Sequence, residues 1–221
     1  MQTPTRALII GASGGIGAAL LAALRATPNT EALALSRPDF DLTDEASIAR
    51  AAAQIGAPLH LIIAATGRLH GDGTAPEKRL SDLTPSQLAA SFAINAIGPA
   101  LLLKHFAPLM PRGEPAAFAL LSARVGSIGD NGLGGWYGYR ASKAALNQLV
   151  RTASIELART HKHAKILALH PGTVRTALAA PIIGEARGDP PALAAQRLLA
   201  VIAQAPASGA FLDQNGVTIP W

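Results

Sequence analysis

The segment Tyr139-Arg140-Ala141-Ser142-Lys143 places a phenol and an ammonium four residues apart near the start of a predicted helix. At this spacing both side chains lie on one helical face. A free phenol has a pKa near ~10, but a nearby ammonium and the positive end of a helix both favour its ionised form. The pair predicts a tyrosine with a lowered pKa that protonates a carbonyl oxygen or deprotonates an alcohol. The alternative is a surface pair whose lysine stem covers apolar neighbours.

A glycine-rich loop, Gly11-Ala12-Ser13-Gly14-Gly15-Ile16-Gly17, follows a short apolar run and opens a helical pattern. Glycines let the backbone turn tightly and approach a pyrophosphate, whose charge then faces the free N–H groups of the helix N-terminus. The order of strand, loop and helix is the context that a dinucleotide site needs. The simpler interpretation is a flexible turn, because glycine-rich turns are common.

The second apolar run ends in Leu35-Ser36-Arg37. A site for NAD places a carboxylate at this point, hydrogen-bonded to the adenosine ribose. Here Ser36 takes that position, and Arg37 follows with a guanidinium suited to bidentate phosphate binding. We therefore expect NADP(H) to be favoured over NAD(H). A solvated surface arginine is the alternative.

Short apolar runs alternate along the chain with longer segments of helical period. The predicted strands are Ala7–Ile10, Ala32–Leu35, Leu59–Ala64, Ala116–Ser122 and Ile166–His170, and the predicted helices are Gly15–Arg25, Glu45–Ile55, Gln87–Leu109 and Tyr137–Thr160. This alternation predicts right-handed βαβ units in one α/β domain that spans residues 1–221, with a parallel sheet between two helical layers. Gly/Pro-rich stretches near residues 67–76, 126–135 and 181–191 are predicted to be loops.

Composition excludes several classes of protein. The 221 residues suit one large domain, and a hydrophobic content of 49% is ample for a core. The chain has no cysteine, which excludes disulfides and thiolate zinc sites. His161 and His163 are two apart and have no carboxylate companion, so no metal site is expected.

Charge and hydropathy give no sign of nucleic-acid or membrane binding. The net charge of +5 comes from basic residues that are scattered rather than gathered in a patch. The apolar stretch Phe92 to Leu103 is interrupted by Asn95, Gly98 and Pro99 and is too short to span a bilayer. The first residues lack the pattern of a signal peptide. We expect a cytoplasmic protein that binds neither nucleic acid nor membrane.

Taken together, the motifs resemble those of a known family. The glycine loop, the Tyr139/Lys143 pair and Pro171-Gly172-Thr173-Val174-Arg175-Thr176 occur in the order and separation typical of short-chain dehydrogenases/reductases. The resemblance covers essentially the whole chain. Ser122-Ala123-Arg124-Val125-Gly126-Ser127, the GGWYGYRASKAALN segment and the terminal Ile219-Pro220-Trp221 are most similar to the C-factor-like branch, which is related to small carbonyl reductases.

The resemblance implies a doubly wound Rossmann fold with about seven parallel strands, and hydride transfer between NADP(H) and a small carbonyl or alcohol substrate. Tyr139 would be the general acid/base, and Lys143 would hold the nicotinamide ribose and lower the Tyr139 pKa. Asn95 would hold a water in the proton relay; a core asparagine that kinks its helix is the alternative. The implied cofactor contacts are Gly11, Ser13, Gly15, Ile16, Gly17, Ser36, Arg37, Asp41, Leu42, Ala65, Gly67, Asn95, Tyr139, Lys143, Pro171, Gly172, Val174 and Thr176.

Some of these positions carry more specific roles or alternatives. Asp41 and Leu42 match the pair that contacts adenine, and the turn from Pro171 to Thr176 matches the one that fixes the carboxamide. A helix N-cap is the alternative role for Thr176. Where the family has Asn-Asn-Ala-Gly, this chain has Ala64-Ala65-Thr66-Gly67, which loses the asparagine bonds across the sheet.

The catalytic serine departs from the family pattern. Counting back three residues from Gly126 gives Ala123 instead of serine. Ser122 is adjacent, although neighbouring strand residues point to opposite faces unless the strand has ended or bulged. Ser127 is a second candidate. We predict that Ser122 polarises the substrate carbonyl.

Two rival functions remain at this level. The alanine at the serine position is compatible with a dinucleotide-binding sensor or signalling protein that has lost turnover, and a scaffold without dinucleotide binding is a third possibility. The short segment Ala177–Pro191 predicts an open lid over the site. The long helices Gln87–Leu109 and Tyr137–Thr160 are expected to pair in a homodimer, or to pack on the protein's own sheet.

Overall fold

The computed structural model describes residues 4–71, 75–184 and 187–221. Residues 72–74 and 185–186 fall in two predicted loops and lie outside the described residues. Six described strands form one parallel sheet in the order β2-β1-β3-β4-β5-β6. The strands are β1 (Thr5–Ile10), β2 (Thr30–Leu35), β3 (Leu61–Ala64), β4 (Ala116–Leu121), β5 (Ala164–His170) and β6 (Ala210–Asp213). The helices are α1 (Gly15–Arg25), α2 (Glu45–Ile55), α3 (Pro85–Phe92), α4 (Gly98–Phe106), α5 (Tyr137–Leu157), α6 (Ala180–Ile183) and α7 (Pro191–Gln204).

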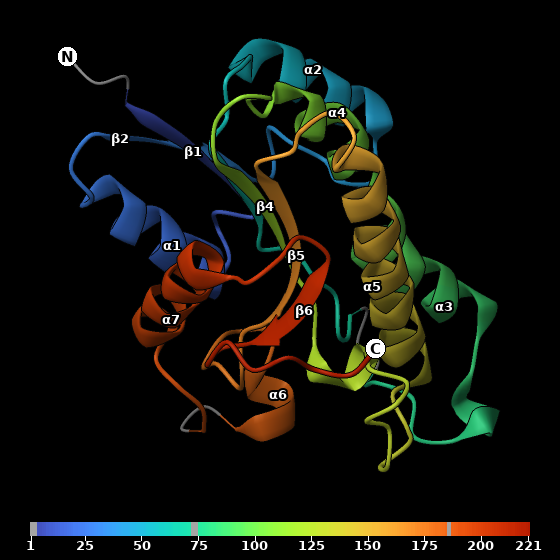
Figure 1. Cartoon of the computed structure of the whole chain (residues 1–221). Helices are drawn as coiled ribbons and strands as arrows, with labels where there is room; N and C mark the ends of the chain where they lie inside the picture. Colours follow the sequence, from blue (N-terminus) through green and yellow to red (C-terminus); the bar gives the residue numbers. More distant parts are fainter. Residues whose placement is uncertain (1–3, 72–74, 185–186) are drawn as a thin grey trace.

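The expected doubly wound α/β domain is confirmed, with six strands among the described residues rather than about seven. Figure 1 shows α1 and α7 on one face of the sheet and α2, α4 and α5 on the other. Successive strand residues point to opposite faces, so Leu8 and Ile10 enter one core while Ala7 and Ile9 enter the second. This double burial explains why the strands read as continuous apolar runs.

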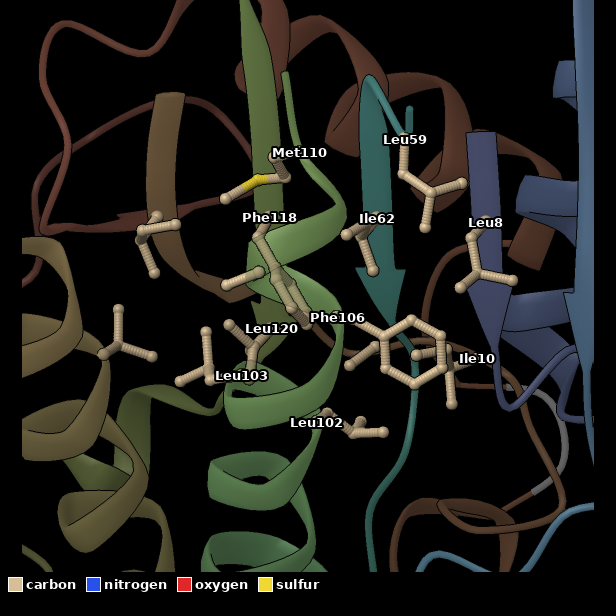
Figure 2. Close-up of a cluster of buried hydrophobic side chains, with 14 of the residues drawn as sticks. Leu8, Ile10, Leu59, Ile62, Leu102, Leu103, Phe106, Met110, Phe118 and Leu120 are labelled. Atoms are coloured by element: carbon tan, nitrogen blue, oxygen red, sulfur yellow. The ribbon is translucent and has the colours of Figure 1, made fainter. Parts of the chain in front are cut away.

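The larger core lies between the sheet and the layer of α2, α4 and α5. Figure 2 shows its centre, where Phe106 from α4 and Phe118 from β4 meet leucines and isoleucines of the neighbouring strands. Both phenylalanines are fully buried. On α5, Leu146 and Val150 face the same core. Part of this helix therefore packs on the protein's own sheet, which was one of the two arrangements expected for it.

The predicted helix Gln87–Leu109 is divided into pieces. It begins earlier, at Pro85, where the Thr84 side chain accepts a hydrogen bond from Gln87 N and proline occupies the first turn. A π-helical segment, Ala93–Ile97, separates α3 from α4. The helical stretch Pro85–Leu109 is, by length and composition, apolar enough to cross a membrane. Its α4 part buries Phe106 against the sheet, as core helices of globular folds do.

A groove of about 420 Å³ runs between α4 and α5. Small and apolar side chains form much of its lining, which includes Ala100, Leu103, Ala107, Leu149, Ala153 and Leu157. The pairing of two copies through these helices stays a prediction.

Phe106→Ala tests the larger core. Removing a fully buried ring leaves a cavity that the packed surroundings fill only in part, so the free energy of unfolding should fall by about 3–5 kcal/mol. Urea denaturation measures the change. Ile155→Ala on the exposed side of α5, where the side chain is 54% exposed, is the control and should change stability by less than about 0.5 kcal/mol.

Candidate active site and cofactor cleft

The glycine loop between β1 and α1 is packed so closely that side chains do not fit. Gly11 has a φ of +86°, and a Cβ there would lie 2.8 Å from the carbonyl oxygen of Ala65. A Cβ on Gly17 would collide with the carbonyl of Gly11, and one on Gly15 would lie 2.8 Å from Thr176 Cγ2. The loop therefore contacts both the end of β3 and the turn after β5, and its backbone borders the space between them.

A cavity of about 540 Å³ opens beside this loop, at the carboxyl ends of β1, β2 and β3. Its volume is typical of a small-molecule site, and crevices at this end of a parallel sheet are where such folds bind ligands. Eight of the predicted cofactor residues line it, namely Gly11, Ser13, Ser36, Arg37, Asp41, Leu42, Ala65 and Gly67. Residues that the sequence did not single out complete the lining, among them Thr43, Thr66, Arg68, His70, Ile94 and Leu178.

Polar side chains line the β2 end of the cavity. Asp41 accepts hydrogen bonds from the backbone N–H and the hydroxyl of Thr43, both at 2.8 Å, and these bonds lower the pKa of Asp41. Arg37 is exposed at the cavity wall. Leu42 is buried against Gly98, where a Cβ would lie 2.5 Å from Leu42 Cγ. The carboxylate is thus tied into its own turn, while the guanidinium faces solvent.

Asn95 lies fully buried in the π-helical segment and connects two other elements. Its Oδ1 accepts from Arg68 N at 2.8 Å, and its Nδ2 donates to Arg68 O at 2.8 Å and to Ser142 Oγ at 3.0 Å. The Ser142 hydroxyl in turn donates to the backbone oxygen of Tyr139 at 3.0 Å. One amide group therefore holds the loop after β3 against the first turns of α5. π-Bulges inside helices are frequent at functional sites.

Lys143 and Tyr139 are brought together as predicted, on the inward side of α5. Lys143 is 2% exposed, and its Nζ donates to Leu121 O at 2.7 Å and lies 5.9 Å from the centre of the Tyr139 ring. A Cβ on Gly67 would lie 3.7 Å from both Lys143 Nζ and Asn95 Oδ1. The pair is therefore not a surface pair. The Lys143 Nζ and the Asn95 amide meet beside Gly67, in the loop that borders the cavity, and the Tyr139 ring lies next to Lys143.

Burial sets the ionisation of this pair, and here the structure differs from the sequence prediction. Burial lowers the pKa of Lys143 to about 7 and raises the pKa of Tyr139 to about 12. The expected lowering of the phenol pKa is not found. Burial is the cause of both shifts, because it disfavours the charged form of each group.

Ser122 was predicted to polarise a substrate carbonyl, but in the structure its hydroxyl contacts another side chain of the protein. Its buried hydroxyl donates to Asn147 Oδ1 at 2.6 Å, and Asn147 Nδ2 donates to Gly126 O at 3.3 Å. β4 ends at Leu121, but Ser122 still has strand-like pairing through its N–H, so its side chain stays on the α5 side of the sheet. This contact argues against Ser122 as the group that polarises a substrate.

The other candidates at this position are also enclosed. The Ser127 hydroxyl is buried and accepts a hydrogen bond from Asp130 N at 3.1 Å, while Ala123 offers only a methyl group. Asn147 was missed by the sequence reasoning. Its position four residues after Lys143, on the same helical face, was the available signal.

The turn after β5 closes the other side of the cleft. Gly172 has a φ of +78°, and a Cβ there would lie 3.0 Å from the Gln214 side-chain amide. Val174 is buried, and Ile16 packs against the second core beneath this side of the loop. The Thr176 hydroxyl accepts from Ala179 N at 3.3 Å, within the turn that leads to α6. The N-cap of α6 is Ala179, so the alternative role of Thr176 as a helix N-cap is not found.

Comparison with known proteins agrees with this geometry. Residues 16–204 match the family model described as enoyl-(acyl carrier protein) reductase, which covers most of the chain. The chain belongs to the short-chain dehydrogenase/reductase family. Members of this family are oxidoreductases, and the Rossmann fold described above is theirs.

Two curated relatives from the family and two solved structures give the range of similarity. The chain is 36% identical to the C-signal protein of Myxococcus xanthus over 143 residues, covering 64% of this chain and 83% of that protein. It is 30% identical to 1-hydroxy-2-glutathionyl-2-methyl-3-butene dehydrogenase of Rhodococcus sp. (strain AD45) over 189 residues, covering 83% and 79%. NADPH-bound carbonyl reductase from chicken fatty liver superimposes with a TM-score of 0.81 at 26% identity, covering 100% and 96%. Carbonyl reductase Sniffer of D. melanogaster gives a TM-score of 0.83 at 21% identity over the whole of both chains, which shows the shared fold.

The pKa of Lys143 generates a prediction about stability. Its folded pKa of about 7 lies below the ordinary value of 10.5, so between these values the unfolded chain binds more protons than the folded one and stability rises with pH. The free energy of unfolding of the wild type minus that of Lys143→Met should therefore increase from pH 7 to pH 9, by up to about 1.4 kcal/mol per pH unit. Urea denaturation across this range measures it. A difference that stays flat would contradict the lowered pKa of Lys143.

Proposed function

We propose that this protein is an NADP(H)-dependent oxidoreductase that reduces a carbonyl group, or oxidises an alcohol in reverse, with Tyr139 as the general acid/base. The observation that carries the proposal is that Lys143 meets Asn95 beside Gly67 with the Tyr139 ring next to it. Tyr139 and Lys143 come from α5, whereas Asn95 and Gly67 come from other parts of the chain that only the fold brings to this helix.

The ionisation of Tyr139 suits the direction of reduction. With a pKa raised to about 12, the phenol stays protonated at neutral pH and is ready to donate to a carbonyl oxygen. The resulting phenolate would lie near the Lys143 ammonium, whose cation favours it. The chain from Tyr139 O through Ser142 Oγ to Asn95 Nδ2 keeps the first turn of α5 in register while the proton moves.

The residues present fit a dinucleotide. The Gly11 and Gly17 positions admit no side chain, so the loop packs closely on the start of α1, and its exposed residues Ser13 to Gly15 can face a phosphate group at the helix N-terminus. When bound, the nicotinamide cofactor supplies the hydride. Lys143 would hold the ribose, and the turn that contains Gly172 and Thr176 would fix the carboxamide, as the family resemblance implies.

The β2 end of the cavity supports NADP(H) over NAD(H). Ser36 and Arg37 line it where a carboxylate would bind an unphosphorylated ribose, and Asp41 is turned to Thr43. The NADPH-bound chicken carbonyl reductase supports the same choice of cofactor and of substrate class.

A dinucleotide-binding signalling protein with little turnover is the second candidate. Ser122 is bonded to Asn147 and Ala123 has no hydroxyl, so substrate polarisation would rest on Tyr139. The similarity to the Myxococcus C-signal protein also favours it. Consumption of NADPH against a panel of aldehydes, ketones and quinones separates the two candidates: turnover supports the enzyme, and tight NADPH binding without turnover supports the sensor.

Tyr139→Phe should lower kcat about 10²- to 10⁴-fold, because the ring stays and the transferable proton is removed. NADPH affinity, measured by the fluorescence of the bound cofactor, should change less than about threefold, since Tyr139 is one of many implied cofactor contacts and its ring is kept. Tyr137→Phe, two residues earlier on the same helix, is the matched control and should keep full activity. Unchanged kcat in Tyr139→Phe would refute the mechanism.

Arg37→Ala tests the preference for NADP(H). Loss of the guanidinium should raise the KM for NADPH about tenfold or more and leave the KM for NADH nearly unchanged, because only NADPH carries the 2′-phosphate. Steady-state kinetics with both cofactors measures the ratio. Arg25→Ala, at the far end of α1, removes the same charge away from the cavity and is the control. An equal rise in the KM for NADPH in this variant would mean that the effect comes from net charge and not from a contact with the 2′-phosphate.

A further inference from the structure

A buried carboxylate lies against the N-terminal end of α5, outside the predicted site. Glu77 belongs to the segment before α3 and is only 6% exposed. Buried carboxylates are rare unless they are paired or hydrogen-bonded. No sequence motif includes this residue, and the proposed chemistry does not use it.

Glu77 supplies the cap that α5 lacks in its own sequence. The first N–H groups of a helix have no partner within the helix, and Trp136 at the N-cap position makes no side-chain capping bond. Glu77 Oε2 instead accepts from Gly138 N at 3.2 Å, and the backbone oxygen of Glu77 accepts from Trp136 N at 2.5 Å. A negative charge at this end also complements the helix dipole.

The capped residues are the immediate neighbours of Tyr139. Trp136 has a φ of +52°, in the left-handed region that bulky side chains seldom adopt, so its backbone needs to be held there. Its ring packs edge-on against the Tyr139 ring, with centroids 6.3 Å apart and an interplanar angle of 69°. The bond from Trp136 to Glu77 thus fixes the aromatic neighbour of the phenol.

Gly138, directly before Tyr139, leaves room for the carboxylate. A Cβ there would lie 2.9 Å from Glu77 Oε1 and 3.3 Å from Ser91 Oγ. The carboxylate therefore packs directly on the backbone of the first turn. Even a methyl group at position 138 would have to displace it.

The segment that carries Glu77 is itself held from the other side. Asp82 Oδ2 accepts hydrogen bonds from Lys78 N at 3.0 Å and from Arg79 N at 2.9 Å, and these bonds lower the pKa of Asp82. The backbone next to Glu77 is thereby fixed at a sharp turn. Glu77 is a rigid support for α5 and not a free surface chain.

We propose that Glu77 is a positioning residue, which caps the first turn of α5 and holds the Tyr139 phenol in its reactive orientation. The part of this inference that concerns turnover rests on the proposed function. The part that concerns the phenol's environment does not, and the two are tested separately.

The kinetic test compares Glu77→Ala with Glu77→Gln. Loss of the cap should lower kcat about tenfold or more while the KM for NADPH changes less than about threefold, because small displacements of a reacting group are costly and the cofactor cavity is untouched. Glu77→Gln keeps an acceptor oxygen and should restore kcat to within about threefold of the wild type. Glu114→Ala, an exposed glutamate just before β4 at the opposite end of the sheet, is the control.

The spectroscopic test needs no turnover. The chain has two tyrosines, so in a Tyr137→Phe background the near-ultraviolet absorbance of tyrosinate reports Tyr139 alone. With Glu77 in place the phenol should remain largely unionised near pH 10. Glu77→Ala should admit water and move its pKa toward the free value of about 10, whereas Glu77→Gln should not. Circular dichroism at each pH confirms that the fold is retained.

Gly138→Ala gives an independent variant if Glu77→Ala does not fold. It keeps the carboxylate but displaces it, so it should reproduce both the loss of kcat and the fall in the Tyr139 pKa. An unchanged Tyr139 titration in the folded variants would overturn the proposal. If the wild type turns over no substrate, the proposed function fails, and the titration still decides the role of Glu77.

Discussion

A buried lysine is the constraint around which the site is built. Lys143 lies among core side chains at the carboxyl end of β4, and burying a charge there is unfavourable unless a strong acceptor is in reach. The Leu121 carbonyl is that acceptor. It fixes the distance between α5 and the sheet at the turn that carries Tyr139, and Leu146 and Val150 continue the same contact along the helix. Asn95 then joins α5 to the loop after β3. These two walls of the cleft are therefore connected through a side chain of the π-helical segment.

The wall on the β5 and β6 side depends on ionic contacts instead. Arg124, next to the alanine at the serine position, pairs with Asp130 at 3.1 Å and with Asp213 at 3.3 Å. It thereby connects the turn after β4, the loop that leads to α5 and the end of β6. Asp213 also accepts from Asn215 N and Val217 N, so one carboxylate orders the tight turn at the end of the sheet. Buried hydrogen bonds therefore stabilise the side of the cleft formed by α5 and the loop after β3, whereas partly exposed ion pairs stabilise the side formed by β5 and β6.

The features that could be predicted from the sequence are those that depend on interactions between residues close together in the chain. The Tyr139/Lys143 spacing and the glycine loop define their geometry over a few residues, and both lie where they were predicted. The direction of the Tyr139 pKa was wrong for this structure, because it depends on the burial of both groups and not on their spacing. Asn147, the hydrogen-bond partner of Ser122, was missed because it comes from α5. The local sequence around Ser122 does not indicate which side chain of a distant helix will contact it. β6 was missed because four residues carry too little periodicity to be distinguished from a loop.

The π-helical segment at Ala93–Ile97 makes the position of Asn95 sensitive to chain length rather than to side-chain identity. A π-turn contains one residue more than an α-turn, so deleting a single residue here would restore regular α geometry. The flanking helices would keep their faces, and the change would fall on the residues of the wide turn itself, Asn95 among them. The amide that now spans from Arg68 to Ser142 would leave the interior although no functional residue had been replaced. Insertions and deletions in this stretch are therefore expected to be far less tolerated than substitutions, in contrast to the surface loops at the same end of the sheet.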